Sequence, residues 1–296
     1  MLLVPRLAGV CLAVATLIIG GTSCSLLVDT TGLIGSESGM SENAHPAPDG
    51  RDRDGTDAGA AGPLPPGVFD ASGPVGEYRN LVLADGPSLY YTFEETSGPV
   101  QDAMGRHHGT VVGNPQRGVD GALPDSRGIR FGGTIDGIDV GDKFAFPDRA
   151  PFTIETWFRP DAYDSEYRFI FARDHSSGST RQALNFWVRS NRWDFERYID
   201  GSGRGAAINP PPPAGEWYHF ALTYDGSTIQ VYLDGELRAS SSDTRSFKAP
   251  PTTFYVGRGS WSDSALRGIL DEFAIYERAL PAERIKAHYD AGVGAR

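Results

Sequence analysis

The clearest pattern in the chain is a pair of alternating apolar runs at residues 217–236. In the first run Tyr218, Phe220 and Leu222 share one face of an extended segment, because side chains alternate with a period of two along a strand. The Asp-Gly-Ser-Thr sequence at residues 225–228 supplies turn chemistry before the second run begins. The segment therefore predicts a β-hairpin whose apolar face must be covered by a second sheet.

The opposite face of this hairpin carries His219, Thr223 and Tyr232. These side chains alternate away from the apolar face, so the pattern alone does not place them in the core. We therefore keep all three as candidates for contact with a ligand.

Similar alternation continues from about Asn80 onward, with turn residues at short intervals, and this is typical of an all-β domain. Helical spacing appears at residues 281–290, where a proline opens the segment and Ile285 and Tyr289 fall on one face. The glycine-rich stretch at residues 201–205 leads into a run of prolines, so we interpret it as a loop. We expect one β domain with a short C-terminal helix.

The N-terminal segment has the features of an export signal. Its apolar run from Leu7 to Ile19 is too short to span a bilayer but fits a secretory signal peptide at residues 1–23. The small residues that lead into Cys24 resemble a bacterial lipoprotein signal, although Gly21 stands where an aliphatic residue is usual. The resemblance implies a lipidated Cys24 and, because Ser25 follows it, the outer membrane. The alternative is a secreted protein with one unpaired thiol.

Residues 24–76 are rich in Gly, Pro, Ala, Ser and Asp and show no apolar period, which predicts a disordered tether before a folded domain at residues 77–296. Of the 2 cysteines, Cys11 leaves with the signal and Cys24 is acylated, so the domain has neither a disulfide nor a cysteine metal site. The formal net charge of −11 argues against nucleic acid as a partner. We expect a monomer that contacts the membrane only through its lipid anchor.

Five motifs occur in order along the domain: YTFEETSG at 91–98, DAMGRHHGT at 102–110, FTIETWFRP at 152–160, the hairpin, and GILDEFAIY at 268–276. In this order they resemble the laminin-G-like, concanavalin-A-like jelly-roll domains of bacterial surface proteins. The resemblance implies an antiparallel two-sheet jelly-roll sandwich, a role in binding rather than catalysis, and often a structural calcium ion at the rim of the sandwich.

One carboxylate falls on an apolar face. Alternation puts Asp271 beside Ile269 and Phe273, and a carboxylate in such a position needs a strong partner. Ca²⁺ fits this need, and the resemblance implies Asp102 and the backbone carbonyls of residues 106–109 as its other ligands. The alternative is that backbone amides or an arginine satisfy Asp271.

The same fold carries β-glucanases, whose motif, by resemblance, places three carboxylates on one strand as nucleophile and general acid. Here Asp271-Glu272 is preceded at the matching position by Ile269, so the nucleophile is missing. The pair Asp194 and Glu196 has no supporting pattern, and we interpret it as solvated surface. We therefore predict no catalytic residues and keep a glycan hydrolase only as a minor alternative.

Aromatic faces with polar neighbours on an exposed sheet or loop are the equipment expected for sugar binding. Asn185, Trp187 and Arg189 alternate outward on one predicted strand, and Trp261 lies in a polar loop, whereas Trp157 matches a packing position. We therefore expect a non-catalytic recognition module on the cell surface that binds a glycan or glycoprotein through these four residues. A structural or adhesion component that contacts envelope proteins is the alternative, and the ligand stays unidentified.

Overall fold

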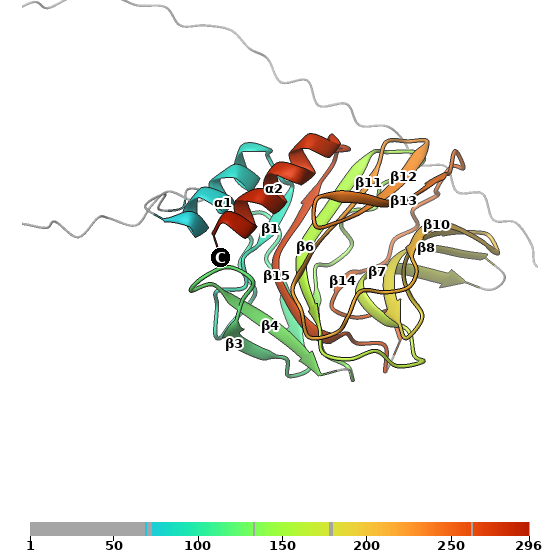
Figure 1. Cartoon of the computed structure of the whole chain (residues 1–296). Coiled ribbons are helices and arrows are strands. Elements are labelled where there is room, and N and C mark those ends of the chain that lie inside the picture. Colours follow the sequence, from blue (N-terminus) through green and yellow to red (C-terminus); the bar gives the residue numbers. More distant parts are fainter. Residues whose placement is uncertain (1–68, 70–72, 133, 178–179, 262, 296) are drawn as a thin grey trace, which may run out of the picture. The chain divides into compact units, whose positions relative to one another are not determined.

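The computed structural model describes residue 69 and residues 73–132, 134–177, 180–261 and 263–295. These residues form two antiparallel sheets packed against each other, together with two helices (Figure 1). The predicted all-β sandwich is therefore confirmed. The predicted signal peptide and lipidated Cys24 lie outside the described residues, as do residues 24–68 and 70–72 of the predicted tether. The prediction of disorder is wrong for residues 74–76, which form the start of a helix. No helix of the described part is long and apolar enough to cross a membrane.

The larger sheet has 8 described strands in the order β13-β12-β11-β6-β15-β4-β3, and β1 also pairs with β15. The predicted hairpin forms β11 and β12, with Phe220 opposite Leu233 and Leu222 opposite Val231. The strands of this sheet are β1 (Leu89–Tyr91), β3 (Gln116–Asp120), β4 (Arg127–Gly132), β6 (Phe152–Pro160), β11 (Tyr218–Tyr224), β12 (Thr228–Leu233), β13 (Glu236–Ser242) and β15 (Arg267–Tyr276).

The smaller sheet has 7 described strands in the order β10-β9-β8-β7-β14-β5-β2. Its strands are β2 (Thr110–Val112), β5 (Gly137–Asp139), β7 (Arg168–Ser177), β8 (Thr180–Arg189), β9 (Arg192–Ile199), β10 (Ser202–Ile208) and β14 (Phe254–Val256).

Strand β10 corrects the interpretation of residues 201–205 as a loop. The glycines allow the edge strand to approach β9 closely, because a Cβ at Gly205 would lie 1.6 Å from the carbonyl oxygen of Phe195. A Cβ at Gly203 would lie 2.4 Å from Oε1 of Glu196. These glycines are therefore required for pairing at this edge and leave space for the Glu196 side chain.

Aromatic side chains of both sheets form the core. Phe186 of β8 meets Phe220 of β11 with 4.1 Å between ring centroids, and Phe158 of β6 meets Trp193 of β9 at 5.1 Å. All four are completely buried, as is Leu222. Each such side chain contributes about 1.5–3 kcal/mol by leaving water. The inner faces are therefore the apolar faces that the alternation predicts.

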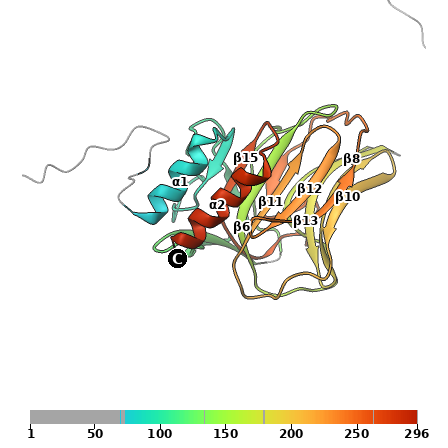
Figure 2. The same ribbon diagram turned by 45° about the horizontal axis from the view of Figure 1, so that its top comes forward.

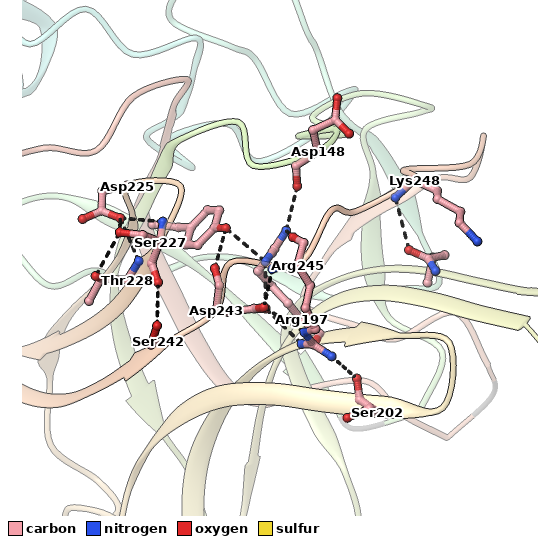
Figure 3. Close-up of polar contacts among 12 residues, drawn as sticks. Asp148, Arg197, Ser202, Asp225, Ser227, Thr228, Ser242, Asp243, Arg245 and Lys248 are labelled. Carbon is pink, nitrogen blue, oxygen red and sulfur yellow. Dashed lines mark hydrogen bonds and ion pairs between the residues drawn. The ribbon is translucent and has the colours of Figure 1, made fainter.

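A buried ionic cluster also joins the two sheets (Figure 3). Arg197 of β9 donates from Nη1 to Oδ2 of Asp243 at 2.7 Å and from Nη2 to the carbonyl of Asp148 at 3.0 Å. Arg245 donates from Nε to Oδ1 of the same Asp243 at 2.8 Å. Because Asp243 directly follows β13 of the larger sheet, this carboxylate ties the end of one sheet to the middle of a strand in the other.

Two helices lie side by side on the outer face of the larger sheet: α1 (Pro74–Ala84) and α2 (Ala282–Gly294) (Figures 1 and 2). Helix α2 confirms the predicted C-terminal helix, whereas α1 was not predicted. The buried side chains of α1 include Tyr78, Val82 and an arginine, Arg79, which pairs with the completely buried Glu272 at 2.7 Å. A helix that buries an ion pair lacks the continuous apolar stripe by which helices are found in a sequence.

The two helices cover the outer face of the larger sheet, which the alternation pattern did not assign to the core. His219, Thr223 and Tyr232 are exposed by only 0%, 2% and 2%, so their candidacy as ligand contacts is wrong. Trp157 lies under α2, where a Cβ at Gly292 would come within 2.4 Å of its Cζ2 atom. Trp157 is therefore a packing residue, as its match to the family predicts.

The contact between α2 and the sheet is polar at its centre. Nδ1 of His288 lies 2.9 Å from Oε1 of Glu155 on β6, and Nε2 lies 3.0 Å from Oδ2 of Asp85. Carboxylates accept hydrogen bonds at both ring nitrogens, so the ring holds two protons. Burial alone would lower the pKa of His288, and the charge of Arg284 acts in the same direction, but the charge and hydrogen bond of Glu155 together with the charge of Asp85 outweigh them and raise it.

The raised pKa of His288 predicts how stability changes with pH. Its contribution is fully present below the ordinary imidazole pKa of about 6.5 and is lost as pH rises through the raised value. We expect the free energy of unfolding to fall as pH rises above about 6.5, and to fall less in a His288→Gln variant, as measured by urea denaturation. Equal pH dependence in the two proteins would contradict this account.

Candidate functional site

The outer face of the smaller sheet carries a pocket of about 300 Å³. Both helices lie on the larger sheet, so this face is the uncovered one among the described elements (Figure 1). The pocket lies over β7, β8 and β9 and is lined by Tyr167, Phe169, Arg181, Asn185, Trp187, Glu196, Tyr198 and Trp261.

The alternation of two adjacent strands builds the floor of the pocket. On β8 the outward positions carry Asn185 and Trp187, while Phe186 between them lies in the core. On β9 the outward positions carry Glu196 and Tyr198, and Glu196 stands directly opposite Asn185. Polar and aromatic side chains from both strands therefore meet on one surface.

Aromatic rings form the walls. Trp187 is exposed by only 3% and packs with Phe169 in a small apolar cluster. Tyr167 meets Trp187 edge-on at 4.8 Å and Trp261 meets Phe169 edge-on at 4.9 Å. Tyr167 and Trp261 are each 43% exposed, so two accessible rings stand over two buried ones.

The positive charge of Arg181 is neutralised within the protein. Its Nε donates to both oxygens of Asp174 at 3.1 and 3.0 Å, and its guanidinium lies 4.7 Å from the ring centroid of Tyr198 and 6.0 Å from that of Trp261. The hydrogen bonds to Asp174 raise the pKa of Arg181. Arg181 is therefore a rigid part of the wall.

Two hydrogen-bond acceptors remain in the floor. Asn185 is 1% exposed and its Nδ2 faces Asp174 at 3.5 Å, while its Oδ1 has no hydrogen-bond partner among the described residues. A buried acceptor without a partner costs about 1–3 kcal/mol. The carboxylate of Glu196 makes no hydrogen bond or ion pair within the described part of the chain. A ligand that brings hydrogen-bond donors would satisfy both groups.

The structure brings three of the four sequence-predicted ligand residues together: Asn185, Trp187 and Trp261 all line the pocket. Arg189 lies outside the lining. Its Nε donates to the carbonyl of Ser165 at 2.8 Å, and its guanidinium stacks 4.4 Å from the ring of Tyr167. Arg189 therefore supports a wall from behind.

Sequence reasoning missed the other lining residues, among them Glu196 and Tyr198. Period-two alternation in the neighbouring strand was the available signal, because it puts both on one face.

The interpretation of Asp194 as solvated surface is wrong. Asp194 is 8% exposed, and burial raises its pKa to about 7 despite an ion pair with Arg192 at 3.1 Å.

The two carboxylates assigned to calcium have other partners. Oδ1 of Asp102 accepts the backbone N–H groups of Tyr90 and Met104 at 2.9 and 3.0 Å. Its Oδ2 accepts those of Arg106 and His107 at 3.0 and 2.9 Å. Amide hydrogens thus surround the carboxylate where a calcium site needs oxygen ligands.

Asp271 is also bound by the protein. Its Oδ2 accepts from the backbone N–H of Ala122 and from Oγ of Ser126, both at 2.8 Å, while burial raises the pKa of this carboxyl well above its usual range. The described residues contain no group of three or more His, Cys, Asp or Glu that could hold a metal ion. Asp102 and Asp271 as they stand do not fit a shared calcium ion, and calcium binding stays a prediction of the resemblance.

Treatment with a chelator distinguishes a protein that binds structural calcium from one in which protein donors alone bind these carboxylates. We expect the unfolding temperature of the purified protein to be the same in EDTA and in millimolar calcium chloride, because amide and hydroxyl donors already bind three of the four oxygens of these carboxylates, and only Oδ1 of Asp271 has no hydrogen-bond partner among the described residues. Differential scanning calorimetry measures it. A rise of several degrees in calcium that magnesium does not reproduce would support the calcium prediction instead.

Comparisons with known proteins agree with this architecture. Pappalysin-1 of Mus musculus is 25% identical over 182 residues, which is 55% of this chain and 11% of pappalysin-1. A Trypanosoma rangeli sialidase in complex with 2,3-difluorosialic acid superposes with a TM-score of 0.53 at 18% identity, over 69% of this chain and 32% of the sialidase. The binding domain of botulinum neurotoxin serotype D gives 0.55 at 14% identity, over 71% and 51% of the two chains.

The chain thus spans less than two thirds of each of these proteins, and identities this low to solved structures show the fold alone. A family model described as the concanavalin A-like lectin/glucanases superfamily matches residues 132–286, more than half of the chain. The matched segment contains β7, β8 and β9 and therefore the floor of the pocket. This chain belongs to the concanavalin A-like lectin/glucanases superfamily.

Proposed function

We propose that this protein is a non-catalytic recognition module that binds carbohydrate in the pocket over β7, β8 and β9. The observation that carries the proposal is a buried acceptor without a partner, Oδ1 of Asn185, in a pocket walled by the accessible rings of Tyr167 and Trp261. A sugar ring offers apolar C–H groups to the aromatic walls and hydroxyl donors to the floor.

The size of the pocket and its position support this proposal. About 300 Å³ is at the lower end of the range for small-ligand sites, enough for one or two sugar rings. The fold also serves binding elsewhere, since its solved examples include a sialidase with a bound sialic acid derivative and the binding domain of a neurotoxin.

The chemistry of the pocket favours binding over hydrolysis. Most glycoside hydrolases use two carboxyl groups, one on either side of the scissile bond. Among the described residues that line the pocket, Glu196 is the one carboxylate. Asp194, on the same face of β9, lies outside the lining and pairs with Arg192. We therefore assign no catalytic residue.

We also propose that the module is displayed at the bacterial cell envelope. The support comes from the sequence: a signal-like segment at residues 1–23, a cysteine at position 24 in a lipoprotein-like context, and a Gly- and Pro-rich stretch up to residue 76. Several acyl chains on Cys24 would hold the protein on the outer membrane, and the tether would hold the domain away from it.

Removal of an accessible ring tests the site. We expect Trp261→Ala to weaken retention on a bound polysaccharide or glycan array by about fivefold, because one aromatic face contributes on the order of 1 kcal/mol. Trp187→Ala should weaken it further. Leu237→Ala is the control, since Leu237 is 50% exposed on β13 of the other sheet.

Unchanged retention of the Trp261 variant on a glycan that the wild type binds would contradict the assignment of the pocket. No retention on broad arrays, together with reproducible cross-linking to one envelope protein in intact cells, would favour the adhesion alternative.

A further inference from the structure

Most charged side chains in and beside the pocket form ion pairs, but one does not. Arg181 has its hydrogen bonds to Asp174, so this pair contributes no net charge. Arg192, behind Trp187, is paired with Asp194. Glu196 is the one charged lining residue that has no ion pair within the described part of the chain. The pocket itself is therefore negatively charged where the ligand would lie.

The carboxylate of Glu196 is kept uncovered by the neighbouring strand. Its Oε1 lies where the side chain of residue 203 would begin, and only glycine leaves that position empty. Residue 205, directly opposite Glu196 on β10, is also a glycine. Two glycines on the edge strand thus leave room for this carboxylate over β10, and no side chain of either residue covers it.

A second acceptor stands on the other side of Glu196. Asn185 is its cross-strand partner, and directly opposite side chains on one face have Cβ atoms about 4.5–5.5 Å apart. Because Nδ2 of Asn185 faces the carboxylate of Asp174, the acceptor Oδ1 is the atom left without a partner. The floor therefore presents two acceptors from neighbouring strands, the carboxylate of Glu196 and Oδ1 of Asn185, and the guanidinium of Arg181 is close enough to interact electrostatically with Glu196.

We propose that the ligand is an amino sugar with a free, protonated amine. The ammonium binds the carboxylate of Glu196, and Oδ1 of Asn185 accepts a hydrogen bond from a hydroxyl of the same ligand. An ammonium brings three donors and no acceptor, which matches the two acceptors of this floor. An N-acetylated sugar lacks the positive charge of the ammonium and therefore binds less tightly. An acidic sugar is repelled by the carboxylate of Glu196. This inference rests on the proposed function, because it requires that the pocket binds carbohydrate.

Three oligosaccharides of equal length test the inference by calorimetric titration of the full chain: chitosan, cello- and chitin oligosaccharides. They share one backbone and carry an amine, a hydroxyl or an acetamide at carbon 2. We expect the chitosan oligosaccharide to bind at least tenfold more tightly than the other two. Glu196→Gln, which keeps shape and acceptor but loses the charge, should abolish that preference.

Glu236→Gln is the control, because the Glu236 side chain is 73% exposed on β13 of the larger sheet. Two results would overturn the inference: equal affinity for all three oligosaccharides, or a preference for chitosan that persists in Glu196→Gln. The proposed function would still stand if Trp261→Ala weakens binding of these oligosaccharides. Failure of the chitosan oligosaccharide to bind would overturn the inference, and failure of every glycan on a broad array would also overturn the proposed function.

Discussion

The ion pairs that hold the helices against the larger sheet decide which surface of the sandwich is available. Glu155 of β6 is completely buried and contacts His288 of α2, while Glu272 of β15 contacts Arg79 of α1. Each pair places a charge where an uncovered sheet would expose it to water, so the helices and the polar face of the sheet require one another. With that face closed, the outer face of the smaller sheet is the one that the described elements leave uncovered, and the proposed binding pocket lies there.

On the smaller sheet the two-residue period of the strands separates stability from binding. Phe186 and Phe195 point inward to the core, and Asn185 and Glu196 point outward between them. The same strands therefore supply the apolar packing that holds the sandwich and the acceptors of the pocket. The tightly packed inner faces keep the outward side chains in a fixed register, and a rigid floor reduces the entropy that a ligand loses on binding.

The sequence predicts the sandwich, the hairpin and three of the eight residues that line the pocket, because the sandwich, the hairpin and two of these three residues depend on alternation within a strand. Asn185 and Trp187 could be found this way, and Trp261 by its polar loop. The cover over His219 could not, since it depends on a helix far along the chain and on a buried Glu155 that pattern alone assigns to no partner. The sequence did not predict β10 as a strand, because its glycines show no apolar alternation. They allow close approach to β9 and leave room for the side chain of Glu196.

Membership of the superfamily fixes the architecture, whereas the ligand depends on a few outward side chains. The central claim is that the pocket over β7, β8 and β9 binds a glycan. The most direct measurement is an NMR titration that follows the indole N–H signals of the 5 tryptophans while a glycan on which the protein is retained is added. The account predicts that the signals of Trp187 and Trp261 shift, while that of Trp157, buried beneath α2, does not. Shifts confined to tryptophans outside the pocket would contradict it.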